Sequence, residues 1–377
     1  MELYAALKLG WWLLLGLVLT GTATLMGSDM GAGALLRVVA RSDIERRACL
    51  NALGPHWEGN QTWFVLAGGA SFAAFPLLYA TAFSSLYLPM LALLWSMLLR
   101  PPGFEYRSKL PQRAWREAWD WALVLGSALP MLLFGAVFGR LLLGLDFDFD
   151  RSLRASHGAN AAALLHPFAL VCGLLSLALA AMQGAAVLSR RCGGDVGVRA
   201  RKAGLAAAAA ALLLFALASA WAARLDGWLL LSHPGAGLAQ TPLQQQVLVL
   251  PGAWQASFER HPLLWLLPLL ALLGLLGAAA CLQRWRAGAA WRLGVLAWVG
   301  VLGTAGASLF PFLLPSRTAP AHSLTLWNAA SSRSTLAWMS GFTLVLLPLV
   351  LLYTRWCFKV MLGRVDPAEI EDSDHAY

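Results

Sequence analysis

The stretch GPHWEGNQTWFVLAGGASFAAFPLLYA, residues 54–80, changes from polar to apolar within a few positions. After Glu58 the chain has no charged residue before Arg100. Charged side chains are costly inside a bilayer, so this uncharged run predicts helices that cross a membrane. The apolar part is about 40 residues long, which is too long for one span. Pro76 and Tyr79 mark the expected turn between two spans.

The composition of the whole chain supports the same class. Of 377 residues, 59% are hydrophobic and 12% are charged, and the usual charged share of a soluble domain is about 25%. The mean hydropathy is +0.64. The net charge of +9 comes from arginines scattered between apolar runs, a pattern that does not indicate nucleic-acid binding. We therefore expect an all-α polytopic membrane protein whose first apolar run is retained rather than cleaved.

About nine transmembrane helices are predicted within a single transmembrane domain, residues 1–377. The expected spans are 9–28, 61–80, 82–100, 119–143, 161–188, 203–223, 262–283, 291–314 and 335–358.

The connections between these spans alternate in charge. Every second connection is rich in arginine and lysine, which places it on the cytoplasmic side. The N-terminus is then periplasmic, and residues 359–377 form a cytoplasmic tail. Residues 224–261 are the long periplasmic loop, which either lies on the membrane surface or forms a structured lid. The acidic turn at 145–151 is expected to be solvated.

Polar residues near the predicted membrane boundaries are the candidate functional groups. Asp29 follows the first span and can act as an interfacial cap or join a proton path; its neighbouring glycines would let helices approach closely. Glu58 lies just before the second span on the predicted cytoplasmic side, where a carboxylate can pass protons inward. The bland alternative for this stretch is capping and anchoring, and residue type alone does not decide between the two.

The residues around Glu58 have simple structural interpretations. Asn60 could cap the following helix, and Trp57 and Trp63 could anchor it at the interface, beside His56. Arg100 ends the third span and could orient the helix, reach the membrane surface, or pair with Glu58 or Glu105.

Neither a metal site nor a haem site is predicted for this chain alone. The five cysteines are far apart and form no CxxC motif. A haem needs axial His or Met ligands inside the membrane, and no helix carries two histidines at ligand spacing. His56 and His166 lie only at predicted helix ends. We expect structural roles for these residues.

Two apolar helices contain apparent breaks, at Gln183–Gly184 and at residues 310–315. Broken helices occur in transporters, where they expose backbone to a cavity. No charged residue accompanies these breaks at mid-membrane depth. This argues against an ion-coupled transporter, although a stand-alone secondary transporter remains the alternative hypothesis.

Several segments resemble, in order, subunit II of the cytochrome bd quinol oxidase family. They include the MQGA motif and the LYTRWCFKVMLGRV end, and the most specific is HWEGNQ followed by AGGASFAAFP. The form accompanying ubiquinol-oxidising enzymes, including cyanide-insensitive ones, is the most similar. The longer matching segments are residues 11–33, 45–76, 79–94, 100–109 and 310–332.

The resemblance implies a subunit of a respiratory terminal oxidase that oxidises quinol and reduces dioxygen to water. The implied fold is two four-helix bundles and one extra helix in the bacterial inner membrane. The implied partner is the haem-bearing subunit I, which holds two b-type haems and one d-type haem. This chain would ligate no haem, would line a cytoplasmic proton path and, as in some members, would hold a structural ubiquinone. Small single-helix accessory subunits and membrane lipid are further implied partners.

The resemblance also assigns roles to residues. Glu58 would belong to the proton route, where many relatives carry Asp, together with Asp29 and Arg100. Trp57, Asn60, Trp63 and His56 would support it. In this chain Met26 and Asn328 stand where many relatives have carboxylates. Because Met cannot relay protons, any carboxylate function at position 26 would be absent or rerouted.

Overall fold

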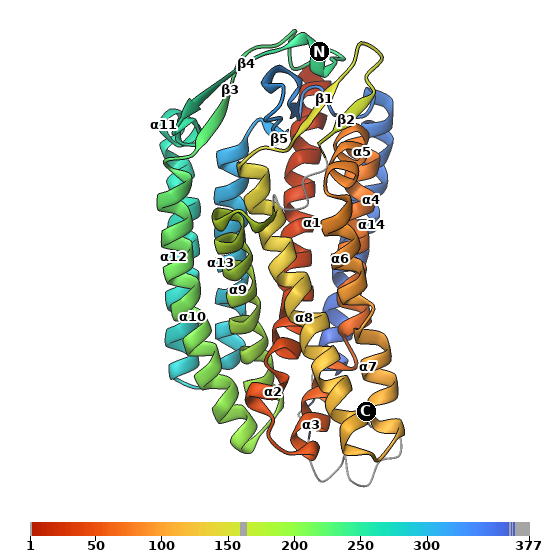
Figure 1. Cartoon of the computed structure of the whole chain (residues 1–377), viewed down its shortest axis with the longest axis vertical. Coiled ribbons are helices and arrows are strands. Elements are labelled where there is room, and N and C mark those ends of the chain that lie inside the picture. Colours follow the sequence, from red (N-terminus) through yellow and green to blue (C-terminus); the bar gives the residue numbers. More distant parts are fainter. Residues whose placement is uncertain (1, 159–163, 362, 364, 366–377) are drawn as a thin grey trace.

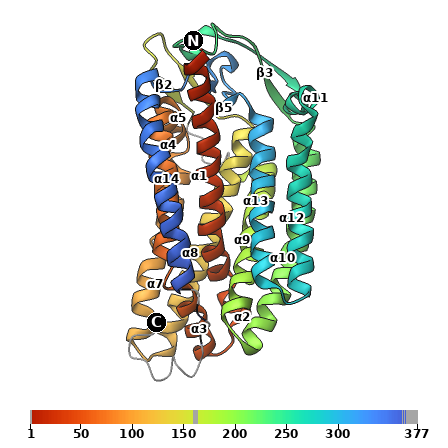
Figure 2. The same ribbon diagram turned by 180° about the vertical axis from the view of Figure 1, so that it is seen from behind.

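The computed structural model describes residues 2–158, 164–361, 363 and 365 (Figures 1 and 2). Most of the predicted tail at 359–377 and the first residues of the span predicted at 161–188 lie outside these described residues.

Long helices dominate the structure and run roughly along its longest axis (Figure 1). The α-helices are α1 (Glu2–Ala34), α2 (Leu36–Val39), α3 (Asp43–Leu53), α4 (Trp57–Ala74), α5 (Pro76–Ser85), α6 (Tyr87–Met97), α7 (Arg100–Tyr106), α8 (Arg113–Leu142), α9 (Pro167–Arg191), α10 (Gly194–Ala222), α11 (Ala256–Arg260), α12 (Leu266–Gln283), α13 (Ala287–Leu309) and α14 (Arg333–Met361). Short 3-10 helices are η1 (Arg107–Lys109), η3 (Pro242–Gln244), η4 (Ala253–Gln255), η5 (Pro262–Trp265) and η6 (Pro320–His322).

Three small antiparallel sheets lie at the end of the molecule where α1 begins (Figure 1). The sheets pair β1 (Phe147–Phe149) with β2 (Ala155–His157), β3 (Asp226–Ser232) with β4 (Gln246–Pro251), and β5 (Phe312–Leu314) with β6 (Leu324–Thr325).

These sheets give structure to segments that the sequence left open. Strands β3 and β4 lie within residues 224–261, with Trp228 opposite Val249, so this segment is a structured hairpin. The segment 145–151 was expected to be a solvated acidic turn, but Phe147 and Phe149 on β1 are buried. Because strand side chains alternate between two faces, Asp148, the one acid of β1, points away from the core that its two phenylalanines enter.

The structure contains seven helices long and apolar enough to cross a membrane, within the described residues. The helix pair Pro76–Ser85 and Tyr87–Lys109, bent by 83° at its break, adds an eighth if the pair is counted as one span. The predicted span at 61–80 corresponds to α4 and the start of α5, which are separated at Phe75, just before Pro76. The predicted total of nine spans, the division into two bundles and the orientation of the termini therefore stay predictions.

Helices α1 and α9 cross with their backbones close together. A Cβ placed on Gly31 would lie 1.7 Å from the carbonyl oxygen of Ala180, and one on Gly184 would lie 2.1 Å from the amide nitrogen of Ala32. Small residues at such contacts let helix backbones approach closely in membranes. The glycines after Asp29 thus have the expected packing role. The break expected at Gln183–Gly184 is wrong, because both residues lie inside the continuous helix α9.

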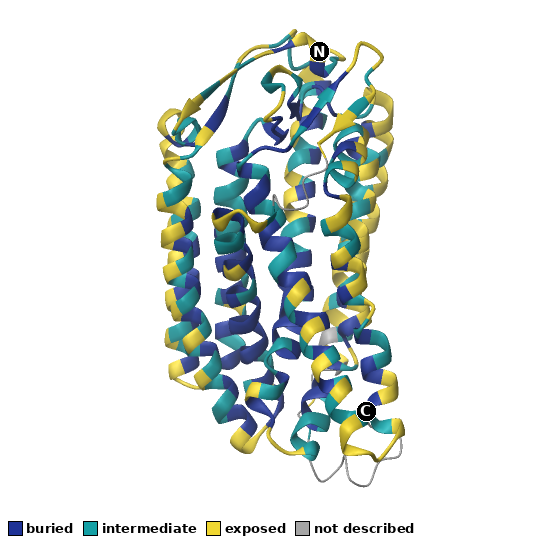
Figure 3. Ribbon diagram, in the orientation of Figure 1, coloured by how far each residue is buried: buried dark blue, intermediate teal, exposed yellow. Residues whose placement is uncertain are grey.

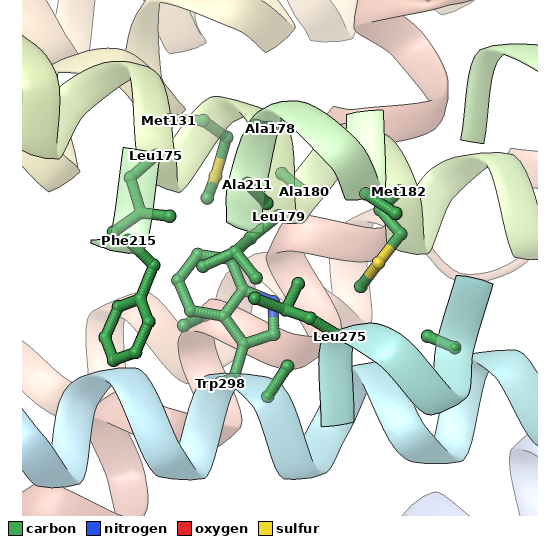
Figure 4. Close-up of a cluster of buried hydrophobic side chains, with 14 of the residues drawn as sticks. Met131, Leu175, Ala178, Leu179, Ala180, Met182, Ala211, Phe215, Leu275 and Trp298 are labelled. Atoms are coloured by element: carbon green, nitrogen blue, oxygen red, sulfur yellow. The ribbon is translucent and has the colours of Figure 1, made fainter. Parts of the chain in front are cut away.

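The largest apolar cluster lies among α1, α8, α9, α10, α12 and α13. Figure 4 shows Phe215, Leu275 and Leu179 around the indole of Trp298, which is 2% exposed. Burial is densest on α9 and falls towards the outer helices (Figure 3). In the apolar window of α14 only 6% of the residues are buried, so this helix lies almost entirely at the surface.

Candidate functional site

Asp29 and Asn60 form the centre of the site. Asp29 lies on the last turns of α1 and is 5% exposed, while Asn60 lies on the first turn of α4 and is 4% exposed. The Asn60 Nδ2 donates a hydrogen bond to Asp29 Oδ2 across 2.5 Å. Asn60 therefore does not cap α4, as one sequence interpretation held. Instead it holds a buried carboxylate, which would otherwise be costly to bury.

Arg100 supplies positive charge next to this pair. It is 1% exposed, and its charge attracts the Asp29 carboxylate. Its side chain lies over the Phe104 ring at 5.8 Å. In the described part of the chain, Arg100 Nε and Nη1 have no hydrogen-bond partner. The guanidinium thus does not reach the membrane surface or pair with Glu58, as the sequence had suggested it could.

Glu58 differs from Asp29 because it is exposed on the outer side of α4. The tryptophans on either side of it in α4 point into the molecule instead. Trp57 stacks on Phe104 with ring centroids 5.1 Å apart, and Trp63 is 8% exposed. These two tryptophans are packing residues rather than the interfacial anchors that one interpretation proposed. The tertiary structure therefore separates Glu58 from the buried group formed by its sequence neighbours.

His56 precedes α4 and is buried against the same group. Burial lowers the pKa of its imidazole to about 4, and the positive charge of Arg191 acts in the same direction. The ring is therefore neutral at physiological pH. His166 is remote from His56 in the chain and accepts a hydrogen bond at Nδ1 from the backbone N–H of Phe168, which caps α9.

A cavity of about 910 Å³ opens beside the buried pair. Asp29, His56 and Asn60 form part of one wall, and apolar side chains of α1, α13 and α14 form most of the remainder. Its size falls in the range of roughly 300–1,000 Å³ that is typical of ligand pockets. A second cavity, of about 170 Å³, lies between α8, α9, α10 and α13 and is lined by aromatic rings that include Phe134, Phe215 and Trp298.

A buried ionic network near the site was not found from the sequence. Arg107 and Asp120 are both fully buried, and Arg107 Nε donates to Asp120 Oδ1 across 2.6 Å. Arg46 reaches the same carboxylate at 2.8 Å, and Arg107 also contacts Asp43 at 2.8 Å. The network joins α3, η1 and α8. The arginines were interpreted only as charges that set orientation, and an Asp placed inside an apolar span was the missed signal.

Lys8 is a second buried charge that sequence reasoning missed. It is 0% exposed near the opposite end of α1. Its ammonium donates to the carbonyl oxygens of Leu238 at 2.9 Å and Trp327 at 2.7 Å, and lies over the Tyr4 ring. This lysine therefore ties the β3–β4 connection and the segment after β6 to α1.

The two positions at which many members of the resembled family carry a carboxylate, and this chain does not, are both buried. Met26 is 1% exposed and belongs to the largest apolar cluster. Asn328 Oδ1 accepts from the backbone N–H of Thr325 at 2.8 Å, and its Nδ2 donates to Gln245 Oε1 at 3.0 Å. Asn328 therefore has a structural role that uses both its donor and its acceptor.

Within the described residues, no group of three or more His, Cys, Asp or Glu side chains could hold a metal ion.

The sequence matches the family described as cytochrome bd terminal oxidase subunit II over residues 7–361. The chain belongs to this family. Subunit II is one part of a multi-subunit bd oxidase, so this chain has a partner subunit.

Individual relatives agree with this assignment. The chain is 41% identical over 374 residues to the cytochrome bd-I ubiquinol oxidase subunit 2 of Escherichia coli K12, covering 99% of both proteins. It is 38% identical over 373 residues to a probable cytochrome oxidase subunit 2 of Haemophilus influenzae, again covering 99% of each. The bd oxidase of Geobacillus thermodenitrificans has a chain with a TM-score of 0.67 and 16% identity, covering 93% of this chain and 98% of that one. This last likeness shows that the two chains share a fold.

Proposed function

We propose that this chain is the haem-free subunit of a quinol oxidase complex that reduces dioxygen to water with protons from the cytoplasm. The observation that carries the proposal is the buried Asp29–Asn60 pair beside Arg100, at the end of the molecule that holds the basic connections. A carboxylate that is both buried and hydrogen-bonded is a suitable proton carrier in a membrane protein. The relatives named as ubiquinol oxidase subunits support ubiquinol as the electron donor.

The partner subunit is proposed to cover the face formed by α4, α5, α6 and α14. On this face Glu58 is exposed at the start of α4, and α14 has almost no buried residues. An exposed carboxylate close to the membrane is costly unless a polar group or water of the partner solvates it. Large exposed side chains on α14 include Trp338, Phe342 and Leu344, as expected for an apolar interface.

The proton route is proposed to lead from Asp29 through water to Glu58 and the partner subunit, while Asn60 positions the Asp29 carboxylate without carrying the proton. Arg100 holds the negative charge of Asp29 in place, and water near its unpartnered Nε and Nη1 can complete the path. Glu58 at the exposed side of α4 is then the last carboxylate of this chain. His56 supports the wall of the site as a neutral group rather than as a charge carrier.

All haems are proposed to lie in the partner, as two b-type haems and one d-type haem. The histidines support this, since His166 caps α9 and His56 lies between α3 and α4 rather than in a helix facing another ligand. A structural ubiquinone would place part of its isoprenoid tail in the cavity of about 170 Å³, whose aromatic walls offer apolar contacts. Small single-helix accessory subunits and an inner-membrane location complete the proposed assembly.

Native purification tests the proposal against the alternative of a stand-alone secondary transporter. The chain should co-purify with a haem-bearing subunit, and the complex should oxidise ubiquinol and consume dioxygen. His56→Ala and His166→Ala complexes should keep three haems in the optical spectrum. Solute transport by the isolated chain would establish the transporter instead, and loss of one haem from an assembled variant would contradict the haem assignment.

A further inference from the structure

The larger cavity has an amphipathic wall that the proton route does not explain. Leu17 and Leu25 of α1, Val295 of α13, and Leu347 and Leu351 of α14 form its apolar surface. The surface helix α14 closes one side of the space and lies beside α1 at the outside of the molecule (Figure 2). The cavity is thus placed where a membrane molecule can enter it from the bilayer.

Five cations line this cavity. Arg190 and Arg191 end α9, Arg292 lies on the first turns of α13, and Arg355 and Lys359 lie on the last turns of α14. Arg191 is buried and the other four are exposed. Among the described residues that line the cavity, Asp29 is the sole carboxylate, and it is already bonded to Asn60. The mouth is therefore strongly positive.

Water alone is a poor occupant for such a space. A volume of 910 Å³ would hold roughly 30 waters at liquid density, each needing two to four polar partners. The leucine and valine part of the wall offers none, so water is poorly bound along it. A positive mouth also repels protons and cations, so it is unsuited to a proton inlet.

We propose that this cavity binds an anionic phospholipid, with its phosphate at the basic mouth and an acyl chain along the apolar wall. Arginine side chains recognise phosphate oxygens in a forked geometry, and a lysine adds a point charge. Basic pockets between transmembrane helices on the cytoplasmic side are typical sites for anionic headgroups. The lipid fixes α14 against α1 and α13, where this helix otherwise has few buried residues.

The proposal is independent of the quinol oxidase chemistry, and lipid retention measures it directly. The purified oxidase complex is exchanged into nanodiscs containing phosphatidylglycerol and phosphatidylcholine in equal amounts, and bound lipids are counted by native mass spectrometry. The wild-type complex should retain phosphatidylglycerol selectively. Replacing Arg292, Arg355 and Lys359 together by Gln should reduce this retention at least tenfold. The Val295→Trp variant, which fills the apolar wall and leaves every charge in place, should reduce it similarly.

A matched control separates the site from general surface charge. Arg284 and Arg286 are exposed on the neighbouring α12–α13 connection and do not line the cavity. The Arg284→Gln, Arg286→Gln complex should retain phosphatidylglycerol as the wild type does. The haem spectrum of each variant reports assembly. If the triple variant does not assemble, the Val295→Trp variant and lipid re-addition to delipidated wild type decide the outcome.

Four results would overturn the proposal. Equal retention of phosphatidylcholine would show that the cations select nothing, and unchanged phosphatidylglycerol in the Val295→Trp complex would remove the acyl-chain site. Retention of a quinone in place of phospholipid would assign the cavity to a neutral ligand. Inorganic phosphate that raises the thermal midpoint of delipidated complex as much as phosphatidylglycerol does would show a free-anion site without a lipid.

Discussion

Asn60 donates a hydrogen bond to Asp29 across 2.5 Å and so joins α4 to the end of α1. Both side chains are buried, and Arg100 provides the nearby positive charge. The Asp29→Asn variant keeps the shape and an acceptor oxygen but removes the ionisable group. We expect quinol oxidase turnover to fall at least tenfold, with haem content unchanged. Wild-type turnover and proton uptake in this variant would limit Asp29 to a structural role.

Glu58 tests the exposed end of the same route. The Glu58→Gln variant removes the charge with little change of shape, so turnover should fall while assembly and haem content persist. Glu58→Asp, the residue of many family members, should retain most of the activity. Oxygen consumption and proton uptake by reconstituted complexes give both readings. Equal activity of the Gln variant would make Glu58 a packing or interface residue.

Met26 allows the opposite test, in which a carboxylate is added rather than removed. The Met26→Asp complex should assemble if the site still accepts the carboxylate that relatives carry there. The cost is burial of a charge among apolar side chains, since Met26 is 1% exposed. We expect a lower thermal midpoint and unchanged haem content. Complete failure to assemble would show that the surrounding core has been repacked around the methionine.

The Arg107–Asp120 pair predicts a large stability effect. Asp120→Ala leaves the fully buried Arg107 without its main partner, and such an uncompensated charge costs about 3–5 kcal/mol. The thermal midpoint of the complex should fall strongly. Glu117→Ala on the same helix breaks the exposed Arg113–Glu117 pair and should change little. Similar small effects for both variants would show that water reaches Arg107.

The Glu45–Arg199 pair predicts a pH dependence. Burial alone would raise the pKa of the Glu45 carboxyl, but hydrogen bonds from Arg199, Arg41 N–H and Ser42 N–H lower it below 4.5. Its contribution to stability is therefore complete above pH 4.5 and is lost as the pH falls through the lower folded-state pKa.

Glu45→Gln keeps the capping box with Ser42 but removes this contribution. Thermal midpoints measured between pH 3 and 7 should fall less steeply on the acid side in this variant. Arg199→Gln should flatten the same limb, and the double variant should add little to either change. A fully additive double variant would mean that the two side chains act separately.

The membrane class of this protein follows from its sequence alone. Apolar runs such as 262–283 and the basic connections between them are local properties, and the bilayer imposes length and charge rules on every span. The family resemblance was also readable, because HWEGNQ and the following AGGASFAAFP are contiguous. Even the end of α13 near Pro311 was visible, although Gln183–Gly184 was misinterpreted as a break.

The roles within the site were decided only by the tertiary structure. Asn60, Trp63 and Arg100 had reasonable local interpretations as a cap, an anchor and an orienting charge, and each proved to be buried against other helices. The Arg107–Asp120 pair and the Gly31–Ala180 crossing depend on contacts between separate helices. Hydropathy describes how a helix lies in the bilayer. The contacts between polar groups on different helices depend on how the helices are rotated and where they cross, and close backbone packing determines both.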